Sequence, residues 1–196
     1  MLEIRWHGRG GQGAKTASEM FAKIVFDSGK FVQSFPEFGP ERAGAPMRAY
    51  NRIADTKIRM NHNIYSPDVV VILDPSLDIL ECLSGIKEDG VVLINVSEEN
   101  FNKLNLKEKI HNIDSNLKIY IIDGDKISKD ELGKVFPNIS VMSALVKISN
   151  LITEEKYFEL GEMVIKNVFS QKESVIEGNI NALKRAYNEV KKVNND

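Results

Sequence analysis

The sequence contains very little cysteine and histidine, which limits the chemistry that the chain can perform alone. Its 196 residues include one cysteine, Cys82, and three histidines. A single thiol forms no internal disulfide and cannot supply the four thiolates that hold an iron–sulfur cluster. Cys82 lies among apolar residues at helical spacing, so we expect a buried, unreactive thiol. His7, His62 and His111 show no metal-ligand spacing, and we predict no metal site.

Net charge and long apolar runs are also lacking. The chain carries 26 Lys and Arg against 28 Asp and Glu, a formal charge of −2. Neither nucleic acid nor an anionic membrane is therefore expected as the main partner. No apolar stretch approaches the ~20 residues of a membrane span, and the N-terminus shows no signal-peptide pattern. We expect a soluble, cytoplasmic protein with one domain over residues 1–196.

Glycine is concentrated where a strand would meet a helix. Residues 2–7 alternate apolar and polar side chains, the period of a strand with one buried face. From Ala14 onward, apolar residues recur at helical spacing. Between the two lies the segment Gly8-Arg9-Gly10-Gly11-Gln12-Gly13. Its glycines allow a tight turn and close approach of the backbone, and the start of the helix favours an anion, phosphate above all.

The remaining chain alternates apolar strands with helices. Continuous apolar runs at 68–73, 91–95 and 118–123 are typical of central strands covered on both faces. Residues 31–35 indicate a further strand. Such alternation predicts an α/β fold, with a Rossmann-like, largely parallel sheet flanked by helices.

Two further features complete the expected fold. The runs 47–53 and 56–60 predict a β-hairpin insertion. The C-terminal third shows helical spacing, and Asn150 is suited to the left-handed cap that would end one of its helices. In sheets of this kind, ligands lie outside the carboxyl ends of the strands, where the glycine segment is expected.

The glycine segment could also belong to a stand-alone dinucleotide-binding oxidoreductase. Gly8, Gly10 and Gly13 satisfy the pattern G-x-G-x-x-G. However, that fingerprint also requires an acidic residue about 20 positions later, at the end of the second strand. Gln33 and Ser34 occupy this strand instead. A stand-alone NAD(P)- or flavin-binding enzyme therefore remains only an alternative interpretation of the chain.

Two other cofactor motifs fit poorly. A P-loop is disfavoured because Ala14 separates Gly13 from Lys15, which turns the lysine about 100° around the helix. Asp123-Gly124-Asp125 has the wrong order for a thiamine-diphosphate site, and we interpret it as a turn in which Asp125 caps a helix. No Ser-His-Asp or Cys-His set can be assembled, so no catalytic residue is predicted.

The segment 36–46 holds three prolines and two glycines and cannot form regular structure. It presents Glu37, Glu41 and Arg42 on a backbone with little freedom. Constrained loops at the ligand end of a sheet often line a site or meet a partner. A rigid connector is the other interpretation.

Two segments together resemble a known family. IRWHGRGGQG at 4–13, followed by FPEFGPERAGAP at 35–46, is similar to the gamma subunit of pyruvate:ferredoxin oxidoreductase. A third patch, PNISVMSAL at 137–145, resembles the start of a later helix in that family.

The resemblance implies an assembly that oxidatively decarboxylates a 2-oxoacid, reduces ferredoxin and transfers the acyl group to coenzyme A. Thiamine diphosphate, Mg²⁺ and [4Fe–4S] clusters would belong to alpha, beta and delta-type companion subunits, with no cofactor bound by this chain alone. This subunit would supply structure and part of the approach to the active site. Arg9 and Arg42 could pair there with phosphate or carboxylate; an interface role for both motifs is equally open. The candidate ligand or interface residues are Gly8, Arg9, Gly10, Gly11, Gln12, Gly13, Glu37, Gly39, Pro40, Glu41, Arg42 and Gly44.

Overall fold

A seven-stranded sheet forms the centre of the molecule. The computed structural model describes residues 1–37, 44–169 and 173–194. The strands follow the order β2-β3-β1-β4-β5-β6-β7 across the sheet. They are β1 (Leu2–Arg9), β2 (Phe31–Pro36), β3 (Pro46–Ala54), β4 (Val69–Ile72), β5 (Val91–Asn95), β6 (Lys118–Ile122) and β7 (Lys191–Lys192). The register makes β3 and β7 run against the other strands, so the sheet is mixed and mostly parallel.

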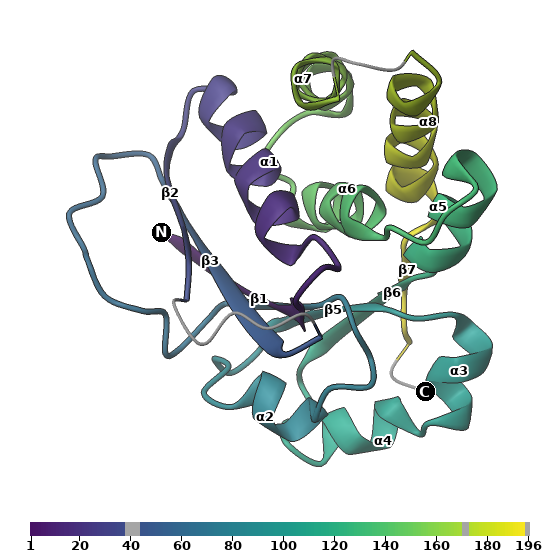
Figure 1. Ribbon diagram of the computed structural model, residues 1–196. Helices are drawn as coiled ribbons and strands as arrows, with labels where there is room; N and C mark the ends of the chain where they lie inside the picture. Colours follow the sequence, from purple (N-terminus) through teal and green to yellow (C-terminus); the bar gives the residue numbers. More distant parts are fainter. Residues whose placement is uncertain (38–43, 170–172, 195–196) are drawn as a thin grey trace.

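Helices cover both faces of this sheet. In Figure 1, α1, α5, α6, α7 and α8 lie on one side, and α2, α3 and α4 lie on the other. The helices are α1 (Ala14–Asp27), α2 (Ile79–Leu83), α3 (Glu98–Lys103), α4 (Leu106–His111), α5 (Gly124–Leu132), α6 (Asn138–Ser149), α7 (Glu154–Val168) and α8 (Glu173–Glu189). The predicted α/β architecture and the helical C-terminal third are confirmed.

The predicted hairpin between 47–53 and 56–60 is wrong. The first run lies inside β3, which pairs with β1 on one edge and β2 on the other. No edge of β3 is left for a further strand, and residues 55–66 form none. The hairpin in the sheet is β2–β3, and the segment 55–66 loops outward beyond β2 (Figure 1).

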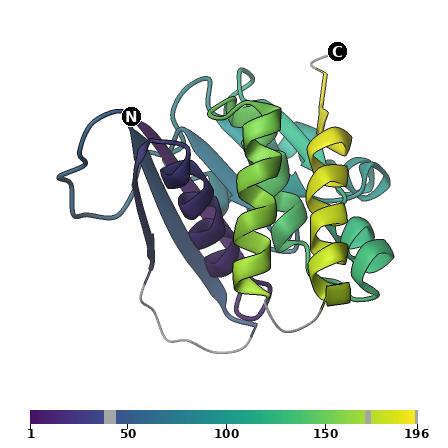
Figure 2. The ribbon, with the colours of Figure 1, turned by 90° about the horizontal axis from the view of Figure 1, so that it is seen from above.

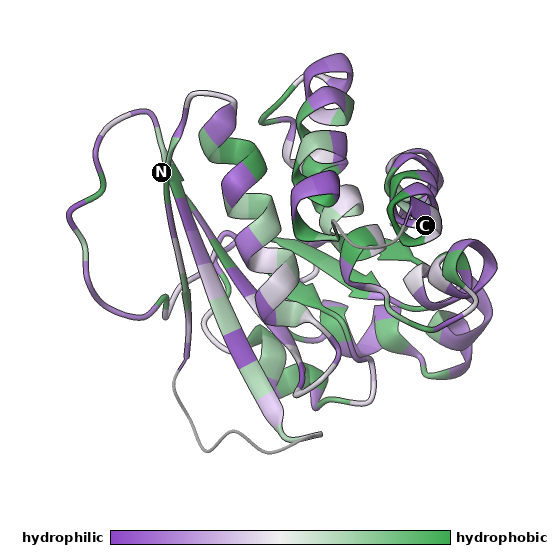
Figure 3. Cartoon of the chain, turned by 45° about the horizontal axis from the view of Figure 1, so that its top comes forward, coloured by the Kyte–Doolittle hydropathy of each residue, from purple (hydrophilic) through white to green (hydrophobic). Residues whose placement is uncertain are grey.

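Two apolar clusters hold the layers together. The larger one lies between the sheet and α1, α6, α7 and α8, and includes Trp6, Phe21 and Leu145. The smaller one, with Ile72 and Leu83, packs α2, α3 and α4 against the opposite face. Figure 3 shows the central strands largely in green, with hydrophilic purple on the outer turns of the helices. Burial of apolar surface is the main force that fixes this arrangement.

One buried polar chain fixes β1, β3 and α1 relative to one another. The indole Nε1 of Trp6 donates to Asn51 Oδ1 at 2.7 Å. Asn51 Nδ2 in turn donates to the Ser18 carbonyl at 3.1 Å. Trp6 and Asn51 are fully buried, so each polar atom needs this partner. Figure 2 shows α1 running along the strands that it covers.

The expectation that β1 buries only one face is wrong. Ile4 and Trp6 face the larger cluster as expected, but Arg5 and His7 on the opposite face are only 6% and 4% exposed. Arg5 donates to the carbonyls of Cys82 and Ser84. Polar side chains are buried here because backbone carbonyls satisfy them, a compensation that an apolar/polar alternation does not reveal.

One of the two predicted helix caps is confirmed and the other is wrong. Asn150 closes α6 with φ of 51°, as predicted, and α1 ends at Asp27, two residues before Gly29. Asp123, not Asp125, caps α5, because its side chain accepts from Lys126 N at 3.0 Å. Asp125 instead accepts from Asn95 Nδ2 at 2.9 Å. Among the helices of the described ranges, none has the length and apolarity to cross a bilayer.

Candidate functional site

The glycine turn joins β1 to α1 at the carboxyl end of the strand. Gly8 packs tightly, since a Cβ there would lie 3.1 Å from Ala14 Cβ. Gly11 and Gly13 have φ of 97° and 81°, a region that other L-residues occupy at a cost. A Cβ on Gly13 would also meet Asn138 Nδ2 at 2.9 Å. Glycine is therefore required here both by backbone conformation and by close packing.

The first turn of α1 has no side-chain cap. Gly13 is the N-cap and makes no side-chain hydrogen bond to the helix. The first intrahelical bond runs from Ala17 N to the Gly13 carbonyl at 2.8 Å. The amides of residues 14–16 therefore lack intrahelical acceptors. Together with the helix dipole, these amides favour an anion at this position.

Backbone hydrogen bonds join the glycine turn to the end of the proline-rich segment. Gly10 N donates to the Ala45 carbonyl at 2.9 Å, and Gly44 N donates to the Gly10 carbonyl at 3.1 Å. Arg9 Nη1 adds a bond to the Gly44 carbonyl at 3.2 Å. Two motifs that lie about thirty residues apart in sequence are therefore one structural unit. Of the predicted site residues, Gly39, Pro40, Glu41 and Arg42 lie outside the described residues.

Asp74, which follows β4, ties the turn to the neighbouring loop. Its Oδ2 accepts from Arg9 Nε at 3.0 Å and from Gln12 Nε2 at 2.7 Å. Its Oδ1 accepts from Ser76 N at 2.9 Å. Gln12 also accepts from Arg9 N through Oε1 at 2.8 Å. Arg9 and Gln12 thus have internal partners, and their visible role is to shape the turn.

A cleft of about 990 Å³ opens beside this unit. The glycine turn and the first residues of α1, Ala14, Lys15 and Thr16, form one wall. A second wall comes from the loop after β4 and from α2, and includes Leu77 and Cys82. Residues of β2 and β3 complete the lining. The cleft lies at the carboxyl ends of the parallel strands, where the sequence placed the ligand site.

Glu37 belongs to a charged network at the rim of the cleft. It accepts from Tyr50 Oη at 2.6 Å and lies 3.6 Å from Arg48 Nη1. Arg48 Nη2 also bonds Glu81 at 2.7 Å. Burial and the hydrogen bond to Glu37 raise the pKa of Tyr50. The hydroxyl is therefore a stable proton donor to Glu37 at neutral pH.

Arg5 and His7 lie beneath this network. Arg5 Nε donates to His7 Nε2 at 3.0 Å. Burial, the charge of Arg5 and the charge of Arg48 lower the pKa of His7 to about 3. The imidazole is consequently neutral at neutral pH. His7 lines the cleft, whereas Arg5 is held behind it by carbonyl oxygens.

Cys82 is buried as expected. It is 4% exposed, and burial together with the charge of Glu81 raises its pKa to about 11. The thiol is therefore protonated and weakly nucleophilic at neutral pH. Within the described residues, no group of three His, Cys, Asp or Glu side chains is placed to hold a metal ion.

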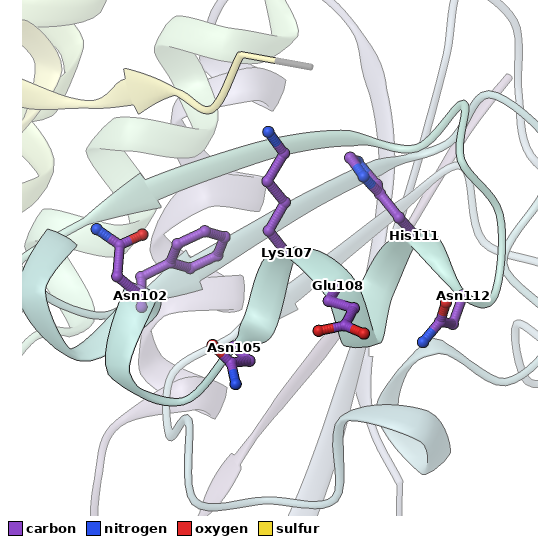
Figure 4. A pocket seen from close by; sticks show the side chains of 7 residues that line it. Asn102, Asn105, Lys107, Glu108, His111 and Asn112 are labelled. Atoms are coloured by element: carbon purple, nitrogen blue, oxygen red, sulfur yellow. The ribbon is translucent and has the colours of Figure 1, made fainter. Parts of the chain in front are cut away.

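A second hollow lies on α3 and α4, far along the chain from the predicted motifs. It measures about 550 Å³, and its lining includes Lys107, Glu108 and His111 (Figure 4). The His111 Nε2 has no hydrogen-bond partner among the described residues. Figure 4 shows these side chains spread along the helix surface without converging on one point, so this hollow lacks the geometry of a site.

A family model supplies the observation that decides the assignment. The model described as "Pyruvate ferredoxin/flavodoxin oxidoreductase" matches residues 3–189. The chain belongs to this family.

Relatives within the family are similar in sequence to this chain over most of its length. Pyruvate synthase subunit PorC of Thermotoga maritima is 41% identical over 192 residues, which cover 97% of this chain and 95% of that protein. The common gamma subunit of the pyruvate/ketoisovalerate oxidoreductases of Pyrococcus abyssi is 42% identical over 174 residues, covering 87% and 88%. The crystal structure of the Thermotoga maritima subunit superposes with a TM-score of 0.79 at 38% identity, and covers 98% of each chain. The chain is thus a gamma-type subunit of a 2-oxoacid:ferredoxin oxidoreductase, as the sequence indicated.

Five of the residues predicted from the sequence, Arg9, Gly10, Gly11, Gly13 and Glu37, line the cleft. Sequence reasoning placed the glycine segment, Glu37 and Gly44 at the site, and the structure brings all of these together. It missed His7, Arg48 and Asp74. The position of Asp74 directly after an apolar strand is a usable signal, because the carboxyl ends of parallel strands share one edge. The burial of His7 has no comparable sequence signal.

Proposed function

We propose that the cleft of this subunit forms part of the route by which coenzyme A reaches the reacting centre of the assembled oxidoreductase. The phosphates of coenzyme A bind at the glycine turn and the uncapped start of α1. The observation that carries this proposal is the set of amides at residues 14–16, which lack helical acceptors and belong to residues that line the cleft. Lys15 adds a cationic side chain that is more than half exposed.

The redox and carbanion chemistry belongs to companion chains in this proposal. Alpha, beta and delta-type subunits hold thiamine diphosphate, Mg²⁺ and [4Fe–4S] clusters, and ferredoxin accepts the electrons. One cysteine in 196 residues cannot supply a cluster. A single unpaired thiol also suits a reducing compartment, so the complex is assigned to the cytoplasm.

Arg9 acts mainly as a support of the cleft in this proposal. Its guanidinium bonds Asp74, Ser76 and the Gly44 carbonyl. A side chain that is tied to three segments holds the wall of the cleft in shape. Phosphate recognition therefore rests mainly on backbone amides, with Arg9 as a support.

Gly11→Asp tests this function in the assembled complex. A side chain at Gly11 meets nothing within 4 Å, and a carboxylate there repels a phosphate near the start of α1. We expect the KM for coenzyme A to rise about 10-fold, with the KM for the 2-oxoacid unchanged.

Gly29→Asp is the matched control. Gly29 follows the other end of α1, also has a positive φ of 103°, and a side chain there also meets nothing within 4 Å. Both variants place the same charged side chain at a glycine of similar positive φ. An equal KM for coenzyme A in the two variants would contradict the proposed function.

A further inference from the structure

Segment 55–66 lies at the end of the sheet that is remote from the cleft. It follows β3, whose residue Ile53 pairs with Leu2 at the amino end of β1. The cleft, in contrast, lies at the carboxyl end of β1, and no residue of this segment lines it. Figures 1 and 2 both show the segment extending outward from the sheet. A role of segment 55–66 is therefore separate from that of the cleft.

Two buried arginines of the sheet hold the backbone of this segment. Arg52 Nη2 of β3 donates to the His62 carbonyl at 2.7 Å, and Arg5 Nη1 of β1 donates to the Tyr65 carbonyl at 3.4 Å. Arg52 is fully buried and Arg5 is 6% exposed. Long connections that lack helix and strand are uncommon in compact domains and are often functional where they are ordered. The anchored segment therefore presents a defined outer surface.

The outer surface of the segment carries two cations and an aromatic ring. Lys57 and Arg59 are exposed, and neither side chain has a hydrogen-bonded or ion-paired partner in the described part of the chain. Tyr65 is 73% exposed. The one carboxylate of the segment, Asp55, is already paired with Lys30 at 2.5 Å. The segment thus offers two free positive charges, although the whole chain has a formal charge of −2.

The backbone of the segment also offers donors. Within the described ranges, the amides of residues 56–66 donate no hydrogen bond to another group of the chain. Cationic side chains and amides are both satisfied by oxygen acceptors, and carboxylates form the stronger bonds with them. A surface that covers this segment well is therefore rich in carboxylate and carbonyl oxygens.

We propose that segment 55–66 is a docking loop for a companion subunit of the same oxidoreductase. The chain is a gamma-type subunit of such a complex, so companion chains are its natural partners. The partner surface carries carboxylates opposite Lys57 and Arg59, and an apolar recess that receives the ring of Tyr65. Arginine and tyrosine are enriched among the residues that dominate the energy of protein interfaces. This inference is independent of coenzyme A binding at the cleft.

The double variant Lys57→Glu, Arg59→Glu tests the docking loop by competition. The substituted and the unsubstituted chain are co-expressed in equal amounts with the companion subunits, and native mass spectrometry measures the share of each in the complex. We expect the substituted chain to take about one tenth of the places or fewer, because each reversal replaces an attraction by a repulsion. An equal share for the two chains overturns the proposal.

Lys118→Glu, Lys134→Glu is the matched control. Both lysines are exposed, and neither side chain has a partner in the described part of the chain. Lys118 begins β6, Lys134 follows α5, and β6 lies far across the sheet from β2. The change in charge is the same, so this variant should take about half of the places in the complex. A share as low as that of the loop variant would show a general effect of charge and overturn the proposal.

Hydrogen exchange of the unsubstituted chain provides a test that does not depend on how the variants fold. The amides of residues 56–66 should exchange quickly in the isolated chain and more slowly in the assembled complex. Unchanged exchange in the complex overturns the proposal. Protection that already appears when the isolated chain is concentrated would indicate a second copy of this chain as the occupant, and also overturns it.

This inference and the proposed function fail separately. The competition and exchange experiments on the docking loop involve no coenzyme A. If they fail, the comparison of Gly11→Asp with Gly29→Asp still tests the cleft. If that comparison fails, the docking loop is unaffected.

Discussion

At the scale of single residues, Asp74 determines the shape of the candidate site. Its carboxylate is only 13% exposed and accepts from Arg9, Gln12 and Ser76. These groups belong to two neighbouring segments that both contribute to the lining of the cleft. One carboxylate therefore couples these segments, and the conformation of the glycine turn depends on its charge.

Asp74→Asn should destabilise the protein in a pH-dependent way. Burial pushes the pKa of Asp74 upward, but hydrogen bonds from Ser76 and Gln12 and the charge of Arg9 outweigh it and lower the pKa below its ordinary 3.8. The stabilisation is thus fully present above about pH 4, and is lost as the pH falls through the lower folded-state value.

We expect the variant to lose about 1–3 kcal/mol of unfolding free energy at pH 7. The difference from the unsubstituted protein should shrink as the pH falls below 3.8, the ordinary pKa of this carboxyl. Urea unfolding at a series of pH values measures both quantities. A difference that stays constant down to pH 2 would show that the charge of Asp74 is not the cause.

At the scale of elements, the segment 55–66 shows how side chains replace regular structure. Some of its carbonyls accept hydrogen bonds from side chains of β2 and β3. Gln33 Nε2 bonds the Met60 carbonyl at 2.9 Å, and Arg52 Nη2 bonds the His62 carbonyl at 2.7 Å. Arg52 is fully buried and also pairs with Glu3 at 2.9 Å. The segment is therefore anchored from beneath, although it contains neither helix nor strand.

Arg52→Met should weaken this anchor strongly. The substitution removes the buried donor of the Glu3 carboxylate and of the loop carbonyls, and leaves Glu3 with Lys87 alone at 3.7 Å. We expect a loss of unfolding free energy of up to about 3 kcal/mol. Amide hydrogen exchange should accelerate at residues 60–65. Arg59→Met is the control, because Arg59 is exposed on the same segment. Equal losses of stability in the two variants would disprove the anchoring role.

The segment 55–66 also shows what could not be predicted from the sequence. Apolar runs correctly gave β4, β5 and β6, because strands buried on both faces carry a strong local signal. Residues 56–60 also have strand-like composition. However, both edges of β3 are occupied by β1 and β2, so no partner remains. Pairing is a property of the whole sheet, and local pattern does not contain it.

At the scale of the whole molecule, the candidate site is assembled from distant segments. The glycine turn was predictable because its residues are contiguous and their conformational demands are local. His7 and Arg48 come together at the cleft through strand order and register, and Asp74 supports it through its bonds to Arg9 and Gln12. Their contribution could not be derived from spacing. The family match over residues 3–189 supports the function of the assembly, and the cleft indicates what this chain adds to it.

Hydrogen exchange of the assembled complex, with and without coenzyme A, tests the central claim most directly. The account predicts slower amide exchange at residues 10–16 when coenzyme A is added, because phosphate oxygens accept from amides of the residues that line the cleft there. Residues 98–111, which carry the separate hollow on α3 and α4, should exchange at the same rate in both states. Unchanged exchange at residues 10–16 with coenzyme A at saturation would contradict the account.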